Sequence, residues 1–312
     1  MRSIFVQSQP KVVSKNKQRL QCSVCNYRVD PSNKSAFTTF PCSVRAFMNE
    51  EFKVWQCPDC QTIHCLDIVD LDRYYSQYPY SKGQLRWLHW FIYGNLQQRL
   101  TKHGFSKTNS LLDYGCGTNG LFVQYLQKQG FVNAYGYDPY ASQDGFGDRA
   151  ILDNKTFDYI LLQDVIEHIE NPKPLLKQLD SLLSPGGYIL IGTPNAAKID
   201  LNRPNVPDSY HEVHIPYHLH IYTRESLESL GRNLQWQPVD FFDRRYDDTP
   251  WFGFNARTTN VYTSLMDGSM DAMFEPLKLS KALTSPNFLF NAAFGYWLSF
   301  HTGMGIMFGK DG

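Results

Sequence analysis

The spacing of hydrophobic positions changes several times along the chain, and each change predicts a different element. Apolar and polar residues alternate in AFTTFP (residues 36–41) and FKVWQC (residues 52–57), which predicts two short strands forming a hairpin. Apolar residues three or four apart then predict an amphipathic helix, with Leu85, Leu88, Ile92, Leu96 and Leu100 on one face. Such a stripe usually packs into a core, and the alternative is that its aromatic neighbours Trp87, Trp90 and Tyr93 cover a ligand pocket.

Beyond residue 108, short apolar runs alternate with helical patterns. The helical patterns lie near residues 119, 172 and 224, and the apolar runs lie near residues 110, 132, 150, 158, 188, 238 and 304. This alternation predicts an α/β fold with a Rossmann-like doubly wound sheet. Ligands of such sheets bind at the carboxyl ends of the parallel strands, so the polar residues that follow each run are the candidates for function.

Four of the seven cysteines form two pairs, CSVC (Cys22 and Cys25) and CPDC (Cys57 and Cys60). Two such pairs can supply four thiolates to one tetrahedral Zn²⁺, which predicts a small zinc-ribbon module at the N-terminal end. Cys42, His64 and Cys65 lie near enough in sequence to replace one ligand. A closed site of four thiolates leaves no position for water, so we expect the zinc to stabilise the module rather than to catalyse.

A glycine-rich turn follows the first apolar run of the large domain. Gly115, Gly117 and Gly120 give the spacing G-x-G-x-x-G, which alone fits several nucleotide cofactors. Asp113 discriminates between them, because a carboxylate beside this turn disfavours a pyrophosphate and favours the ammonium group of S-adenosylmethionine. Asp138 ends the next predicted strand, where its carboxylate can accept both ribose hydroxyls of either cofactor.

With these motifs in order, the chain resembles the class I S-adenosylmethionine-dependent methyltransferases that carry an N-terminal zinc ribbon. The resemblance covers residues 109–245 and rests on LLDYGCGTNG, YGYDPY, FDYILLQDVIEHIENP and LLSPGGYILIGTPN. It implies that Asp113, Gly115 and Gly117 bind the methionine part of S-adenosylmethionine and that Asp138 binds its ribose. Gln163 would lie at the rim of the site, beside the sulfonium. The resemblance also implies an antiparallel last strand in MGIMFGK. The acid that the family places at the adenine amino group has only Asp148 and Asp153 as nearby candidates.

Asp164, Glu167 and His168 follow Gln163 directly, and four more histidines crowd into ten residues downstream, at His211, His214, His218 and His220. Three interpretations remain open. His168 or a downstream histidine, such as His218 or His220, can take the proton of a substrate hydroxyl, with Glu167 beside it. Alternatively, Asp164, Glu167, His168 and His218 bind a second, divalent cation, which resembles the E-x-x-E-H pattern of ubiquinone-pathway and small-RNA methyltransferases. The third interpretation is a purely structural helix start.

The chain has 30 basic and 30 acidic residues among 312, so its global charge gives no sign of a nucleic-acid or anionic-membrane partner. Only three consecutive apolar residues follow Arg2, too few for a secretory signal, which predicts a cytoplasmic protein. No formal charge occurs from Ala282 to Gly309. We expect this segment to form an aromatic helix over the substrate pocket, with peripheral membrane contact as the alternative.

These patterns predict three parts: a zinc-ribbon module at 1–68, an aromatic linker and helix at 69–108, and a class I methyltransferase domain at 109–312 with an aromatic insertion at about 247–300. The expected activity is methyl transfer to a small-molecule, glycan or lipid-linked acceptor, most simply at oxygen. Two alternatives stay open, an RNA methyltransferase and a non-catalytic S-adenosylmethionine-binding protein whose ribbon docks a partner.

Overall fold

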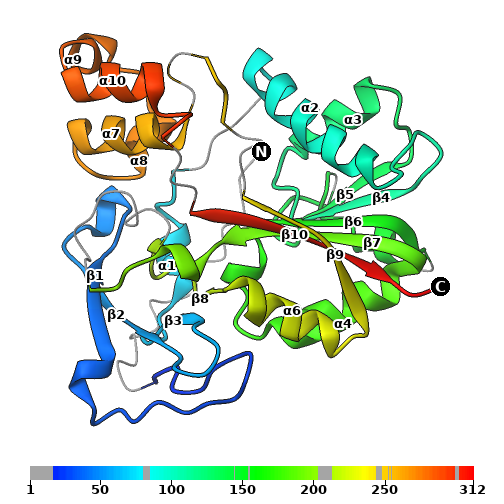
Figure 1. The fold of residues 1–312 in the computed structure, drawn as a ribbon, viewed down its shortest axis with the longest axis horizontal. Helices are drawn as coiled ribbons and strands as arrows, with labels where there is room; N and C mark the ends of the chain where they lie inside the picture. Colours follow the sequence, from blue (N-terminus) through cyan, green and yellow to red (C-terminus); the bar gives the residue numbers. More distant parts are fainter. Residues whose placement is uncertain are drawn as a thin grey trace, which may run out of the picture.

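The large sheet has six strands in the order β5-β4-β6-β7-β10-β9 (Figure 1). The structure is a computed structural model that describes residues 17–79, 85–143, 145–153, 155–202, 213–243, 248–251, 253, 255–298 and 302–312. The strands of this sheet are β4 (Leu111–Tyr114), β5 (Ala134–Tyr137), β6 (Phe157–Gln163), β7 (Leu183–Pro194), β9 (Trp236–Asp243) and β10 (Gly303–Lys310). β5, β4, β6 and β7 are parallel, and β10 is antiparallel to both β7 and β9, which confirms the predicted fold class.

Helices cover both faces of this sheet. α2 (Trp87–Lys102) and α3 (Leu121–Lys128) lie on one face, while α4 (Pro172–Leu182) and α6 (Arg224–Arg232) lie on the other (Figure 1). The strands are apolar on both sides because both faces are buried, so Leu111 packs with α2 and α3 while its neighbour Leu112 packs with α4 and α6. This arrangement leaves the carboxyl ends of the parallel strands as the open edge.

The prediction of a strand near residue 150 is wrong. Arg149–Leu152 form a short 3-10 helix, η3, in the described part of that segment. Asp148 begins it, because its side chain accepts a hydrogen bond from the backbone N–H of Ala150 at 2.9 Å. Leu152 packs into the core from this helix, so the apolar pattern that suggested a strand is satisfied by burial of one turn.

A second sheet, in the order β1-β2-β3-β8, joins the N-terminal module to the large domain. β1 (Phe37–Pro41) and β2 (Glu51–Gln56) are the predicted hairpin, and β3 (Ile63–Cys65) follows the second cysteine pair. β8 (His220–Ile221) comes from the histidine-rich segment, with Ile63 opposite Ile221 and His64 opposite His220. The short elements around it are η1 (Lys34–Ala36), η2 (Arg45–Phe47), α1 (Leu71–Tyr75), η4 (Ile166–His168) and η5 (Ala196–Lys198).

The described residues between β9 and β10 form a lobe of four helices, at the upper left of Figure 1. They are α7 (Ala256–Met266), α8 (Asp271–Phe274), α9 (Leu279–Leu283) and α10 (Pro286–Phe294). The lobe is tied to the N-terminal module through the β1–β2 loop: the N–H of Met270 donates to the carbonyl of Ser43, and Arg45 pairs with Asp267 and Glu275. No helix in the described residues is both long and apolar enough to cross a membrane.

Trp55 connects the two sheets energetically. Its ring is fully buried, its Nε1 donates to the carbonyl of Arg19 at 2.8 Å, and it belongs to the same hydrophobic cluster as Leu112 and Ile160 of the large sheet. The N-terminal module therefore shares a core with the large domain, and the two should unfold together.

We expect Trp55→Ala to lower the free energy of unfolding by about 3–5 kcal/mol, since it leaves a large cavity in a shared core. Denaturant titration should show one transition, followed alike by far-ultraviolet circular dichroism and by zinc release. The control is Trp90→Ala, whose side chain is partly exposed on α2. Two separate transitions would contradict the shared core.

Candidate functional site

A cavity of about 260 Å³ opens at the carboxyl ends of β4 and β6. Its apolar wall comes from helix α2, through Ile92, Tyr93 and Leu96, so part of the predicted amphipathic stripe lines a cavity. Its floor comes from the glycine-rich turn and from the end of β6, through Asp113, Gly115, Cys116, Gln163 and Asp164. Three of the predicted cofactor-binding residues, Asp113, Gly115 and Gln163, therefore face one space.

Asp113 is the buried acid of this cavity. Burial raises the pKa of its carboxyl group to about 7, and the negative charge of Asp138 adds to the shift. No hydrogen bond to its side chain is described, so nothing near it offsets the loss of hydration. A ligand ammonium group would supply the missing positive charge, which fits the amino-acid end of S-adenosylmethionine.

Neighbouring side chains lie so close to the backbone of the turn that two of its glycines leave no room for a larger residue. A Cβ on Gly115 would lie 2.3 Å from Cγ2 of Val165, and the φ of this residue is +81°. Gly120 begins helix α3 and has no room for a Cβ either, because the ring of Phe146 lies 2.3 Å from that position. Gly117 has a φ of +69° and donates its N–H to Asp138 at 2.9 Å.

Asp138 therefore lies beside the turn, at the end of β5, and also accepts the N–H of Tyr140 at 2.8 Å. Gln163 ends β6, where its side chain occupies the space that a Cβ on Gly192 would fill. The two acids considered for the adenine amino group, Asp148 and Asp153, are not among the described residues that line this cavity. The side chain of Asp148 instead caps the short helix η3.

A second cavity of about 440 Å³ adjoins the first, and Asp164 lines both. Its walls mix polar and apolar side chains and come from five parts of the chain. Besides Asp164 they comprise Tyr78, Leu88, His168, Pro194, His214, His218, Asp248, Gly253, Asn255, Ala256, Thr259, Asn260, Met270 and Met273. The lobe closes the cavity through α7 and its flanking residues, whereas the predicted aromatic helix, α10, is not part of the described lining. No lysine or arginine lines it among the described residues.

His168 is held in one orientation at the floor of this cavity. Its Nδ1 lies 3.0 Å from the carbonyl oxygen of Tyr217 and 3.2 Å from the hydroxyl of Tyr75. The carbonyl can only accept, so Nδ1 carries the proton and Nε2 keeps its lone pair. Burial lowers the pKa of His168, which keeps the ring neutral at pH 7.

Glu167, His168 and His218 form a compact group whose potential ligand atoms all lie within 4.8 Å of one another. Glu167 is fully buried, and its Oε2 accepts the hydroxyl of Thr193 at 3.0 Å. Its carbonyl accepts the N–H of Leu219, which brings the His218 segment against η4. Asp164 is not in this group, so the four-ligand cation site considered from the sequence has three members here.

The remaining histidines have different surroundings. His214 lines the second cavity, where its Nδ1 contacts the hydroxyl of Ser43 and its Nε2 lies 3.2 Å from the hydroxyl of Tyr78. His220 lies in β8, with its Nδ1 2.8 Å from Nδ1 of His64 and its Nε2 3.1 Å from the carbonyl of Glu170. This position favours a structural role for His220 over the chemical role considered from the sequence. His211 lies outside the described residues.

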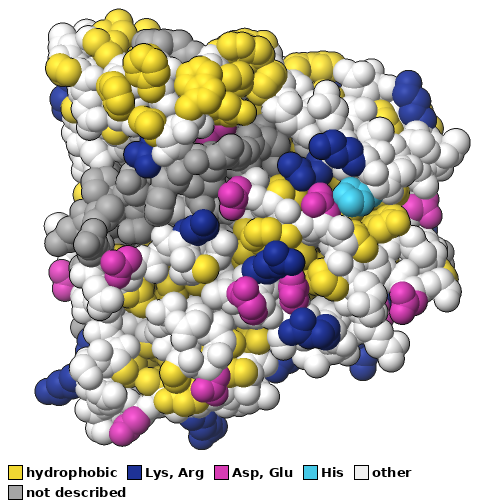
Figure 2. Space-filling model, in the orientation of Figure 1, with side chains coloured by type: hydrophobic (Ala, Val, Ile, Leu, Met, Phe, Trp, Pro, Cys, Tyr) yellow, Lys and Arg dark blue, Asp and Glu magenta, His cyan; other side chains and the backbone are white. Residues whose placement is uncertain are grey.

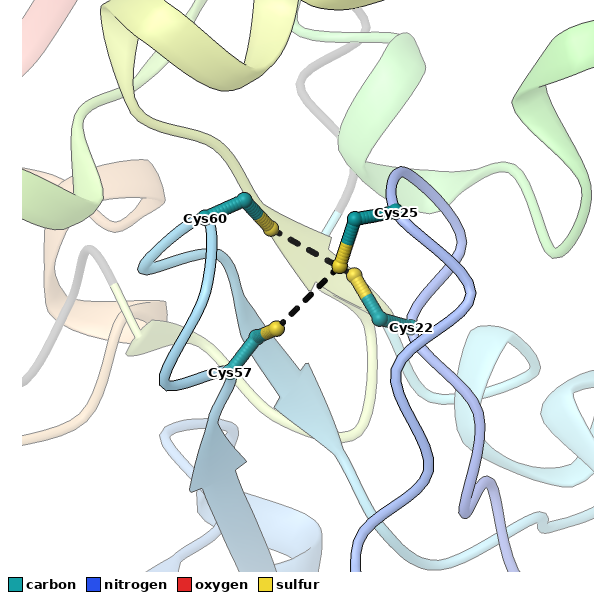
Figure 3. Close-up of side chains that lie close together, drawn as sticks. All are labelled: Cys22, Cys25, Cys57 and Cys60. Carbon is teal, nitrogen blue, oxygen red and sulfur yellow. Dashed lines mark hydrogen bonds between the residues drawn. The ribbon is translucent and has the colours of Figure 1, made fainter.

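The four cysteines of the two pairs converge in the N-terminal module (Figure 3). The sulfur of Cys22 lies 3.4 Å from that of Cys60, and the sulfur of Cys25 lies 3.4 Å from that of Cys57. A tetrahedral zinc with bonds of about 2.3 Å places its sulfurs about 3.8 Å apart, so the group fits this metal. Cys42 and Cys65 lie in a different hydrophobic cluster, and His64 contacts His220.

The thiols of this group differ in acidity. The pKa of Cys60 is lowered, first because the side chain of Cys22 hydrogen-bonds to its sulfur, and the pKa of Cys22 is raised correspondingly. Burial raises the pKa of Cys57 to about 11. A zinc ion would replace the protons that these sulfurs otherwise share.

Comparison with known proteins agrees with the geometry. A family model described as a methyltransferase domain matches residues 93–240, the part that carries the first cavity. Residues 93–240 are a methyltransferase domain. Together with the strand order, this match confirms the predicted class I methyltransferase fold.

The methyltransferase domain has a curated relative in the ubiquinone biosynthesis O-methyltransferase of Parvibaculum lavamentivorans. The two are 32% identical over 101 residues, which is 27% of this chain and 40% of that protein. The chain thus spans about two fifths of the length of the curated relative that it matches.

Solved structures with similar folds share little sequence with this chain. The phosphoethanolamine N-methyltransferase 2 of Haemonchus contortus gives a TM-score of 0.45 at 15% identity, over 80% of this chain and 64% of that one. Coclaurine N-methyltransferase gives a TM-score of 0.38 at 15% identity, over 70% of this chain and 72% of that one. At these scores neither structure bears on the substrate.

Several residues around the methyltransferase domain's second cavity had no motif to identify them. Ser43 comes from the β1–β2 loop, Tyr75 from the end of α1, Tyr78 from the segment after α1, and Asn255 from the cap of α7. They converge only because β3 pairs with β8 and the lobe docks on Ser43 and Arg45. In the sequence, these aromatic and small polar residues form no pattern that distinguishes them from residues of an ordinary linker.

We expect the purified protein to contain one tightly bound zinc per chain, held by the four-cysteine group. Cys57→Ser should lose this metal and much of the stability of the N-terminal module, because a buried ligand is removed. Cys116→Ser is the matched control, since Cys116 is a cysteine outside the group. Metal analysis by mass spectrometry measures the stoichiometry, and equal zinc content in both variants would exclude the site.

The raised pKa of Asp113 predicts opposite effects on stability and on cofactor binding. The pKa of this carboxyl group is about 7 in the folded state and 3.8 ordinarily. Its contribution to folding stability is therefore fully present below pH 3.8 and is lost as the pH rises through 7. Asp113→Asn should therefore raise the melting temperature of the unliganded protein more at pH 8 than at pH 5.

The same substitution should weaken S-adenosylmethionine binding about tenfold or more at pH 8, because it removes the charge that pairs with the ammonium. Differential scanning fluorimetry and calorimetric titration measure the two effects. Asp148→Asn is the control, since Asp148 caps η3 outside the described lining of the cavity. Unchanged affinity in Asp113→Asn would remove Asp113 from the cofactor site.

Proposed function

We propose that this protein transfers a methyl group from S-adenosylmethionine to a hydroxyl group of a small-molecule, glycan or lipid-linked acceptor. The observation that carries the proposal is the meeting of two cavities at Asp164. The first cavity has the buried acid and the glycine turn suited to the cofactor, with Asp113, Gly115, Gly117, Asp138 and Gln163 as the binding residues. The second has histidine, asparagine, threonine and tyrosine side chains together with two acids, Asp164 and Asp248, and these groups suit a polar acceptor that carries hydroxyl groups.

The cofactor supplies an activated methyl group on a positively charged sulfur. In the proposed reaction the acceptor oxygen forms a bond to the methyl carbon while the carbon–sulfur bond breaks and its electron pair stays on sulfur. The hydroxyl proton passes to Nε2 of His168, the nitrogen left without a proton by the bond to Tyr217. Alignment of donor and acceptor and exclusion of water by the lobe would account for most of the rate.

The environment of the second cavity supports a neutral acceptor over RNA. An RNA backbone is held by lysine and arginine, and the described lining contains neither. The ubiquinone-pathway relative carries an O-methyltransferase name, which agrees with oxygen as the acceptor atom. We further propose a cytoplasmic location, where reducing conditions keep the four thiols available for zinc.

The compact group of Glu167, His168 and His218 supports one alternative mechanism, in which a divalent cation acidifies the acceptor hydroxyl. The two mechanisms differ in metal stoichiometry. In the proton-transfer mechanism, zinc-stripped and reconstituted protein binds one metal per chain, and His168→Ala binds the same amount. A second equivalent that both His168→Ala and His218→Ala lose would establish the cation instead.

The function is tested by transfer of a labelled methyl group from S-adenosylmethionine into fractionated cell extract. We expect label in an organic-soluble or glycan fraction, with release of S-adenosylhomocysteine only when extract is present. His168→Ala should lower the rate about 10²–10⁴-fold with little change in cofactor affinity, the usual range for loss of a proton acceptor.

The control for the extract experiment is Asp148→Asn, which should keep full activity. Label that ribonuclease releases as nucleotides would establish the RNA alternative. Cofactor binding without any S-adenosylhomocysteine from complete extract would establish the non-catalytic alternative.

A further inference from the structure

The lobe between β9 and β10 exposes an unusual amount of apolar surface. Eight large hydrophobic side chains of α9, α10 and their flanks are between 37% and 65% exposed: Leu277, Leu279, Leu283, Leu289, Phe290, Phe294, Trp297 and Leu298. We call this set the apolar patch. Figure 2 shows hydrophobic side chains gathered over this lobe at the upper left of the molecule.

The patch follows from how the helices use their faces. α10 buries Phe288, Asn291 and Ala292 against α7, which leaves Phe290 and Phe294, one turn apart, on the outer side. Leu279 and Leu283 of α9 are also one turn apart and exposed. An exposed group of this many large apolar side chains is typical of a surface that binds a partner molecule or a membrane.

The charges around the patch indicate the kind of partner. From Pro276 to Gly309 the only charged side chains are Lys278 and Lys281. Each has one weak contact within the lobe, Lys278 with Glu275 at 3.8 Å and Lys281 with the carbonyl of Met266 at 3.4 Å. The acids just before the patch are held by Arg45, which pairs with Asp267 and Glu275 and donates its N–H to Asp271 at 2.8 Å.

We propose that the apolar patch rests on an anionic lipid surface. Leucine, phenylalanine and tryptophan beside lysine are typical of helices that lie in a membrane interface, whereas protein interfaces are depleted in lysine. The helices are too short to span a bilayer, so the contact is peripheral. Phenylalanine and tryptophan enter the headgroup boundary, and Lys278 and Lys281 reach the phosphates.

Helix α8, which precedes the patch in sequence, also exposes apolar side chains. Met273 is 36% exposed and lines the second cavity, and its neighbour Phe274 is 41% exposed. The inference does not require methyl transfer, because membrane contact and activity are measured separately.

The test is sedimentation with vesicles of phosphatidylcholine alone or mixed with phosphatidylglycerol. We expect the wild-type protein to bind the mixed vesicles and to bind the neutral ones less. The double variant Phe290→Asp with Phe294→Asp should lose about tenfold or more in binding, because two anchors become charged. Lys278→Gln with Lys281→Gln should weaken binding to the mixed vesicles by about tenfold, an effect that added salt reproduces.

The matched control is Val132→Asp, which places the same charge at a side chain that is 72% exposed and far in sequence from the lobe. It should bind as the wild type does. Zinc content and melting temperature verify that every variant is folded. Wild-type protein that stays unbound, or double-variant protein that binds equally well, would overturn the proposal, as would a wild-type dimer that the double variant dissociates in sedimentation velocity.

Discussion

The pairing of β3 with β8 is the constraint on which both cavities depend. β3 is fixed at its start by the second cysteine pair, and β8 directly follows the segment that carries His214 and His218. The N–H of Cys65 donates to the carbonyl of Leu219 at 3.0 Å, while the N–H of Leu219 donates to the carbonyl of Glu167 at 2.7 Å. One residue thus connects the N-terminal module to η4, and this connection brings His168 and His218 to the same wall.

Through this connection the four-cysteine group also helps to position residues of the large domain, in addition to stabilising its own loops. Thr223, which caps α6, donates its hydroxyl to the carbonyl of Cys60 at 3.3 Å, and Ser43 contacts His214. The N-terminal module therefore forms part of the wall that carries the histidines, so disruption of the four-cysteine group should displace His214.

Local signals predicted the first cavity well and the second poorly. The strand, glycine turn and helix around Asp113 lie within one short stretch, residues 111–128, so their spacing in sequence already reflects their spacing in space. The second cavity is assembled from Tyr78, His168, His214 and Asn255, which only the β3–β8 pair and the docked lobe bring together. The strand expected near residue 150 failed for a related reason, because four apolar-rich residues suit one buried 3-10 turn as well as a strand.

Asp164 explains how one short turn can serve two cavities. Its φ is +53°, a left-handed conformation that is uncommon for residues other than glycine, and its N–H donates to the carbonyl of Gly192 at 2.9 Å. This bond holds the chain against β7 while the backbone reverses, so Gln163 faces the first cavity and His168 faces the second. A right-handed residue at this position would carry η4 in another direction and separate the two side chains. Local backbone strain of this kind persists where the surrounding structure fixes it, here through β7 on one side and the carbonyl of Tyr217 on the other.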